Sequence, residues 1–208
     1  MPGIYTHNLL FKRVVDNVVR NRSRSHMMRA LEIMFADKEH LRAGLFGAIG
    51  PDVFDYMSVY NRGGIYGNDI AFYLHDSGCV SFTDRMIEAV IEQRDSRNEW
   101  ASLQKAFLLG YISHVAADAV IHPFTFYFSG FPSSFSRREI MHYRIANLRF
   151  QYNIDNYYLY KSELSAPYTI TIDEMLPESL NGKSVPIWPQ VKVLLLESLK
   201  RDNPQLFG

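Results

Sequence analysis

Hydrophobic and polar positions repeat with helical periodicity along most of the chain. Between residues 8 and 21, aliphatic side chains recur near the 3.6-residue spacing of one helix face, and similar patterns predict helices at 26–36, 37–47, 82–94, 98–120, 137–161 and 190–201. Loops are expected at 61–69 and 181–189, where Gly, Asn and Pro are frequent. A short strand is expected only at 168–173, where apolar and polar residues alternate. The pattern therefore predicts an all-α protein.

The composition is typical of one globular domain, which we expect to span residues 1–208. Basic and acidic residues both number 22, so the overall charge gives no reason to expect nucleic acid as a partner. The single cysteine, Cys79, excludes an intramolecular disulfide and a thiolate zinc site. Any metal must therefore be held by histidine and carboxylate side chains.

The sequence also bears on location. Lys12 and Arg13 interrupt the apolar N-terminal segment, so no signal peptide is expected. No run of about 18 apolar residues occurs, so no transmembrane segment is expected and a cytoplasmic location is predicted. The pattern does not define an oligomeric state.

An apolar segment at 110–124 places His114, Asp118 and His122 at steps of four residues. Side chains at that spacing lie about 5–6 Å apart at Cβ on one face of a helix. His114 and Asp118 could share one metal ion, whereas His122, about 12 Å along the axis from His114, would serve a second ion. Pro123 disfavours α conformation at His122. Spacing alone leaves two interpretations open, a metal site or core side chains satisfied by hydrogen bonds.

Four segments carry a resemblance to a known family: "YTH" at 5–7, "LRAGLFGAIGPDVFDY" at 41–56, "FYLHD" at 72–76 and "AFLLGYISHVAADAVIHPFTFYFSG" at 106–130. In this order they resemble the bacterial zinc-dependent phospholipase C family over roughly residues 4–160. The resemblance implies a helical bundle around zinc ions that hydrolyses a phospholipid or another phosphodiester. It assigns a first zinc to Asp52, His75, His114 and Asp118, and a second to His7 with Asp118 as the bridge. Asp52 would also orient or deprotonate the attacking water.

The third zinc site of the family departs from the pattern in this chain. The resemblance implies that His122 takes partners from a later H-x3-E-x3-D stretch, but the matching positions are Asn147, Gln151 and Asp155. His142 lies five residues before Asn147, about 140° around the helix, and is a poor substitute. We therefore expect two zinc ions, with the third site lost or weakly occupied.

Other interpretations remain open. A degenerate relative would bind a phospholipid or phosphorylated ligand without turnover, and a single-strand nuclease of the related helical zinc superfamily is a third possibility. The aromatic segments 124–131 and 152–160 either line a slot for acyl chains or belong to the core.

Overall fold

The computed structural model describes residues 3–20, 25–54, 67–95, 100–131, 136–164, 171–177 and 187–207. These ranges contain helices and no strand, which confirms the all-α prediction. The α-helices are α1 (Ile4–Arg20), α2 (His26–Ala36), α3 (Lys38–Ile49), α4 (Gly67–His75), α5 (Cys79–Asp95), α6 (Trp100–Ser129), α7 (Arg137–Leu164) and α8 (Pro189–Asp202). Short 3₁₀ helices are η1 (Gly50–Phe54), η2 (Ile172–Met175) and η3 (Pro204–Phe207).

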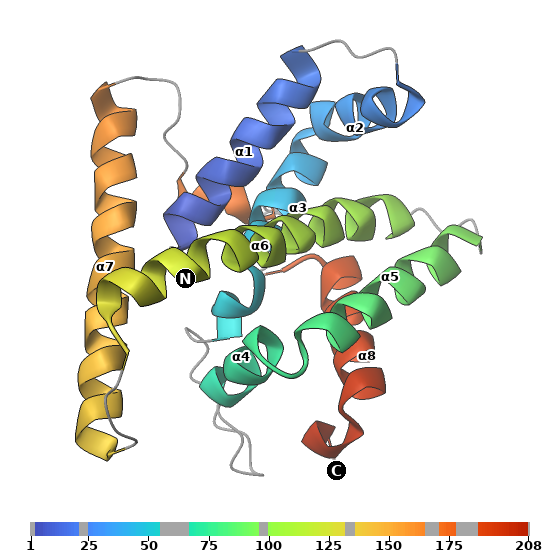
Figure 1. Cartoon of the computed structure of the whole chain (residues 1–208). Coiled ribbons are helices and arrows are strands. Elements are labelled where there is room, and N and C mark those ends of the chain that lie inside the picture. Colours follow the sequence, from blue (N-terminus) through green and yellow to red (C-terminus); the bar gives the residue numbers. More distant parts are fainter. Residues whose placement is uncertain are drawn as a thin grey trace.

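Helix α6 crosses the centre of the molecule, with α1 and α2 on one side and α4, α5 and α8 on the other (Figure 1). Helix α7 stands at one edge, beside the C-terminal end of α6. Most of the buried apolar side chains come from α1, α3, α4, α5, α8 and the first half of α6. The core therefore surrounds the N-terminal half of α6 and leaves its C-terminal half at the periphery.

Helices α3 and α6 cross in backbone contact because glycines lie at the crossing. A Cβ atom on Gly110 would overlap the carbonyl oxygen of Gly44, and one on Gly47 would overlap the carbonyl oxygen of Phe107. Only glycine leaves room for so close an approach of two backbones. The crossing brings the C-terminal end of α3, and η1 after it, against the middle of α6.

Two of the differences from the predicted boundaries bear on the site. Helix α6 continues through Pro123 to Ser129, so the prediction that Pro123 ends α conformation near His122 is wrong. A proline inside a helix removes one backbone hydrogen bond, which a long helix accommodates at moderate cost. Residues 67–69 begin α4 and are not part of a loop, while 61–66 lie outside the described residues. This helix has 9 residues and starts with glycine, so periodicity does not reveal it.

The strand expected at 168–173 falls partly outside the described residues, at 168–170. The part that is described is a 3₁₀ helix from Ile172, so the strand is wrong there. The Glu174 carboxylate accepts a hydrogen bond from the Thr171 backbone N–H at 2.9 Å, and this capping box starts a helical turn.

By length and composition α6 could cross a membrane, which the sequence did not lead us to expect. The first half of this helix packs in the core against α3, and the helix carries the buried polar residues His114 and Asp118 near its middle. A core helix of this kind reaches the same composition as a membrane span.

Candidate metal centre

Polar side chains from four elements converge beside the crossing of α3 and α6. His7 comes from α1, Asp52 from η1, His75 from α4, and His114 and Asp118 from α6. All are buried except His75, which is partly exposed. Segments that are far apart in the sequence thus place three imidazoles and two carboxylates in one region of the interior.

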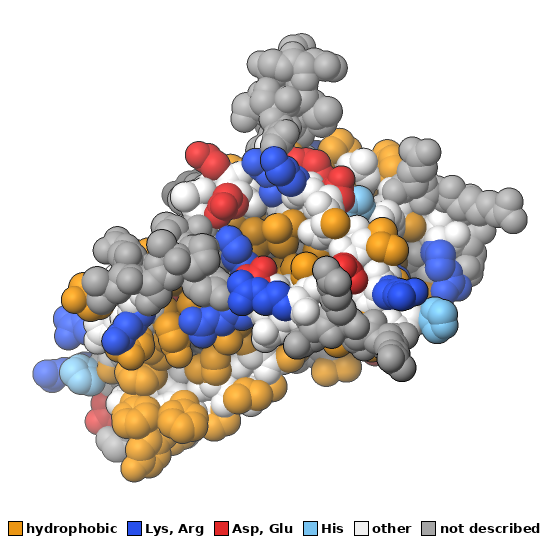
Figure 2. Space-filling model, turned by 90° about the horizontal axis from the view of Figure 1, so that it is seen from above, with side chains coloured by type: hydrophobic (Ala, Val, Ile, Leu, Met, Phe, Trp, Pro, Cys, Tyr) orange, Lys and Arg blue, Asp and Glu red, His pale blue; other side chains and the backbone are white. Residues whose placement is uncertain are grey.

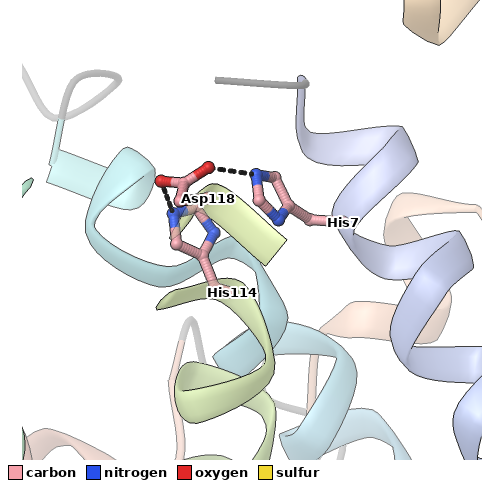
Figure 3. Close-up of side chains that lie close together, drawn as sticks. All are labelled: His7, His114 and Asp118. Carbon is pink, nitrogen blue, oxygen red and sulfur yellow. Dashed lines mark ion pairs between the residues drawn. The ribbon is translucent and has the colours of Figure 1, made fainter. Parts of the chain in front are cut away.

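The Asp118 carboxylate is the centre of this cluster (Figure 3). Its Oδ1 lies 3.2 Å from His7 Nε2 and 3.3 Å from His122 Nε2. Its Oδ2 lies 3.2 Å from His114 Nε2 and 3.7 Å from His75 Nε2. One carboxylate is thus shared by four histidines, which is the position of a bridging ligand.

Backbone carbonyls fix the tautomers of two of these histidines. Nδ1 of His114 donates to the carbonyl of Ala48 at 3.1 Å, and Nδ1 of His75 donates to the carbonyl of Ala71 at 2.7 Å. A carbonyl can only accept, so in each neutral ring the proton is on Nδ1 and the lone pair is on Nε2. Metal-binding histidines in proteins almost always have their second nitrogen held in this way.

The two Nε2 atoms that carry these lone pairs lie 3.4 Å apart. Nε2 of His75 also lies 3.2 Å from Asp52 Oδ1, and Nε2 of His114 faces Asp118. Nitrogen lone pairs and carboxylate oxygens repel one another at such distances unless a proton or a metal ion lies among them. The donor set therefore fits a divalent metal that accepts nitrogen and oxygen ligands, as zinc does.

Two groups of side chains could each hold an ion. The donor atoms of Asp52, His75 and His114 lie within 4.8 Å of one another, and so do those of His7, His114 and Asp118. The two groups share His114, and Asp118 touches both. The geometry thus joins two neighbouring candidate sites.

Several buried atoms in the cluster make no hydrogen bond of good geometry, although most of them face another side chain of the cluster at 3.2–3.3 Å. They are both ring nitrogens of His7, Oδ1 of Asp52, Oδ1 of Asp118 and Nε2 of His122. Buried polar atoms left unpaired cost about 1–3 kcal/mol each. A cavity of about 200 Å³ opens beside them, and His75, His114, Asp118 and His122 are among its lining residues. These atoms are available to an ion, and the cavity offers room for substrate or water.

Burial and mutual contact shift the protonation of the cluster. Burial lowers the pKa of His7, which favours the neutral imidazole that binds metals. Burial alone would raise the pKa of Asp118, but contacts from His114, His122 and His7 outweigh it and hold this pKa well below its usual range. Burial opposes the charged form of His75, yet the neighbouring Asp52 carboxylate raises its pKa. Asp118 thus stays ionised, as a metal ligand must.

Ring packing positions the histidines as well. The rings of His7 and His114 stack with centroids 3.9 Å apart, which links α1 to α6. Gly50 has φ of 62° and also lies directly against the His114 ring. A Cβ on Gly50 would lie 2.6 Å from Cδ2 and 2.7 Å from Nδ1 of that ring. The His114 ring is therefore held between α1 and the α3–η1 junction.

The residues at the third-site positions have other partners. The side chains of Asn147 and Gln151 are hydrogen-bonded to each other on α7. His142 is exposed and lines a different cavity, near the start of α7. Among these third-site positions, His122 is the residue whose side chain contacts the Asp118 carboxylate.

Asp155, the remaining position, holds the N-terminus of α1. Its carboxylate accepts hydrogen bonds from the backbone N–H of Tyr5 at 3.2 Å, from the N–H of Thr6 at 3.0 Å and from the Thr6 hydroxyl at 2.5 Å. Sequence reasoning missed this contact. The signal was the start of α1 at Ile4, which has no Ser, Thr, Asp or Asn before it to serve as the N-cap.

Comparison with protein families gives one match, to zinc dependent phospholipase C, over residues 6–176. Comparisons with curated proteins and with solved structures give no significant match. The matched region contains every histidine and carboxylate of the cluster and most of the chain. The family supports a metal-dependent function of phospholipase type with zinc as the metal. The chain belongs to the zinc-dependent phospholipase C family.

Proposed function

We propose that the protein is a zinc-dependent hydrolase that cleaves a phospholipid-like phosphodiester with an activated water. The proposal is carried by one observation. The Nε2 atoms of His75 and His114 lie close to each other, and each of them faces a carboxylate, that of Asp52 or that of Asp118. Such a donor set could hold a metal ion. Its position beside a cavity gives that cation access to a reactant.

We further propose two zinc ions, one held by Asp52, His75, His114 and Asp118, and one held by His7 with Asp118 shared. Bound zinc lowers the pKa of water toward about 7 and stabilises negative charge on phosphoryl oxygens. Asp118 fixes the separation of the two sites because it contacts histidines of both.

Asp52 has the second role in this proposal. Its Oδ1 is buried and lies 3.2 Å from Nε2 of His75. A carboxylate beside the metal-binding side chains can orient the attacking water and accept its proton. His122 lines the cavity, where it can contact the substrate.

A degenerate, binding-only relative is the second candidate, favoured by one observation. The side chains of Asn147 and Gln151 are hydrogen-bonded to each other, and the Asp155 carboxylate accepts hydrogen bonds from the start of α1. The three positions that would supply ligands to a third zinc therefore have other partners. Loss of one stabilising charge can lower a rate by about 10²–10³. The binding-only protein would hold zinc and a phosphorylated ligand without turnover.

The test combines zinc content with hydrolysis of a chromogenic phosphodiester. Asp118→Asn should lower the zinc content by at least one ion per chain and reduce hydrolysis by about 10² or more. The control is Asp84→Asn, an exposed aspartate on α5, which should change neither. Wild-type protein with two zinc ions but no hydrolysis would favour the binding-only candidate. Failure to bind added zinc in a folded sample would refute both. Degradation of single-stranded nucleic acid in place of the phosphodiester would indicate the nuclease.

A further inference from the structure

A second group of polar side chains lies where the first turns of α3 and α6 meet. The imidazole of His40, on α3, lies between the side chains of Asp37 and Ser102. Its Nδ1–H donates to Oδ1 of Asp37 at 2.8 Å, and the hydroxyl of Ser102, on α6, donates to its Nε2 at 2.7 Å. A carboxylate, an imidazole and a serine hydroxyl joined in this order are the groups by which serine hydrolases activate a nucleophile.

The carboxylate of Asp37 fixes the tautomer of His40. Asp37 is the N-cap of α3 and also accepts a hydrogen bond from the backbone N–H of His40 at 3.0 Å. This hydrogen bond, together with the one from the His40 ring, lowers the pKa of Asp37, so the group is ionised at neutral pH and can only accept. The proton of the neutral ring is therefore on Nδ1, and the lone pair on Nε2 faces the Ser102 hydroxyl. In this state His40 can take the proton of Ser102 as a general base.

The position of Ser102 in α6 supplies donors for a developing negative charge. Ser102 is the third residue of this helix and is exposed, so a substrate can reach it. The first four N–H groups of an α-helix have no partner within the helix, and this end carries a partial positive charge. In other serine hydrolases the N–H of the residue after the nucleophile, here Leu103, serves in the oxyanion hole. The start of α6 can therefore stabilise a tetrahedral intermediate formed on Ser102.

Ser102 also lines a cavity of about 560 Å³, whose walls come from α2, α5 and α6. This volume lies within the roughly 300–1,000 Å³ that is typical of ligand sites. Apolar side chains make up most of the lining, and the exposed Arg94 and Lys105 line it where it reaches the surface. The larger apolar residues are Met34, Ile87, Val90, Ile91, Leu108 and Leu109. An apolar cavity beside a serine nucleophile fits the hydrocarbon chain of an acyl ester.

The serine on its wall is what distinguishes this cavity. Apolar surface alone does not, because hydrophobic side chains also gather elsewhere, as at the lower left of Figure 2. Ser102 and His114 lie on the same helix, about 18 Å apart along its axis at 1.5 Å per residue. Among the residues that the structure describes, this cavity and the one beside the metal centre share none of their lining. Chemistry at Ser102 would thus be separate from chemistry at the metal centre.

We propose that Ser102, His40 and Asp37 form a second active site, which hydrolyses carboxylic esters of aliphatic acids. Oγ of Ser102 forms a bond to the ester carbonyl carbon while its proton passes to Nε2 of His40. The tetrahedral intermediate then expels the alcohol, which takes that proton, and leaves an acyl-serine. Water adds to the acyl carbon in the same way, its proton passes through His40 to Oγ of Ser102, and the carboxylic acid leaves. Asp37 is the positioning residue of this site, since it acts through His40.

The test is hydrolysis of 4-nitrophenyl octanoate by the full chain, with and without a chelator. Ser102→Ala should lower kcat/KM by about 10³ or more, whereas the chelator should leave it unchanged. The matched control is Ser81→Ala. Ser81 is likewise exposed and the third residue of a long helix, but its hydroxyl donates to the backbone carbonyl of Gly78, so its loss should leave the rate unchanged.

A fluorophosphonate probe, which forms a covalent bond to activated serines, gives a readout that does not depend on turnover. It should label Ser102, located by mass spectrometry, in wild-type protein and in Ser81→Ala. Asp37→Asn keeps an N-cap on α3, because Asn and Asp cap helices about equally well, but it no longer fixes the tautomer of His40. It should lower kcat by about 10⁴ and slow the labelling of Ser102, with an unchanged melting temperature.

Three results would overturn the proposal. The first is wild-type protein that the probe does not label at Ser102, and the second is ester hydrolysis that persists in Ser102→Ala. The third is ester hydrolysis that the chelator abolishes while the protein stays folded, which would assign it to the metal centre. We expect kcat/KM for the octanoate to be at least about tenfold that for 4-nitrophenyl acetate, and equal values would overturn the cavity as the acyl site. Phosphodiester hydrolysis is measured separately, so failure of the zinc-dependent function leaves this site standing.

Discussion

Replacement of Gly50 by alanine tests whether the α3–η1 junction positions His114. Gly50 has φ of 62° and ψ of −144°, a backbone conformation that is close to the region occupied almost only by glycine. An added Cβ would lie 2.6 Å from Cδ2 of the His114 ring, against about 3.4 Å or more for ordinary contact. The substitution must therefore strain the backbone and also displace the ring.

The cost has two parts. The backbone strain contributes about 1–3 kcal/mol. Overpacking against His114 contributes roughly another 1–3 kcal/mol. In a chain of this size each kcal/mol lowers the melting temperature by about 2–4 °C. We expect Gly50→Ala to lower it by about 4–24 °C, and to lower zinc affinity, because the ring is moved from both candidate sites.

Gly130→Ala is the matched control. Gly130 also has positive φ, 81°, but a Cβ there would meet no atom within 4 Å. We expect it to cost only about 1–2 kcal/mol, with unchanged zinc content measured by elemental analysis. If Gly50→Ala keeps full zinc affinity and has the same melting temperature as Gly130→Ala, then His114 does not lie against Gly50. That result would refute the account of the site.

Three further predictions concern the cluster and its support. Asp155→Ala should lower the melting temperature by about 2–8 °C through loss of the α1 cap, and should weaken zinc binding about 10–100-fold because α1 carries His7. Asn147→His with Gln151→Glu should add about one zinc ion per chain, measured by elemental analysis, because with His122 it restores three ligands. The pKa of Asp118 is lowered in the fold, so its contribution to stability is complete above its ordinary value of 3.8 and is lost as pH falls below it. Melting curves of zinc-free protein should therefore show an acid limb that Asp118→Asn flattens.

The first of these predictions has a control variant, and the other two each have a result that would contradict them. Asp84→Ala, at an exposed position of α5, should leave both the melting temperature and zinc binding unchanged. An unchanged zinc content in the Asn147→His, Gln151→Glu protein would show that α7 does not face His122. An acid limb that persists in full in Asp118→Asn would assign the acid sensitivity to other carboxylates.

Sequence reasoning reached most of the helices and the His114, Asp118 and His122 candidates because these depend on local spacing, whereas the other candidates came from the family resemblance. The step of four residues from His114 to Asp118 already places them on one helix face, and the structure holds their closest atoms 3.2 Å apart. Long-range contacts were out of reach. The carbonyl of Ala48 that fixes the His114 tautomer, and the carboxylate of Asp155 that caps α1, are 66 and 149 residues away from their partners. Backbone carbonyls and a substituted ligand position carry no sequence signature for such roles.

Pro123 is a second case in which contacts from distant segments decide the local structure. Proline statistics describe an isolated segment, whereas α6 is supported on both sides of Pro123 by contacts with α3 and α7. The helix therefore continues through it, and His122 keeps its direction toward Asp118.

The glycine crossing of α3 and α6 has a consequence for how such chains diverge. Any side chain at Gly47 or Gly110 forces the two helices apart, whether or not the protein still turns over a substrate. A lineage that abandons catalysis is free to replace histidines but must retain these glycines in order to fold. Glycines that are invariant at the crossing would therefore indicate that a chain has kept the fold. Only the histidines and carboxylates beside the crossing would indicate whether catalysis is still under selection.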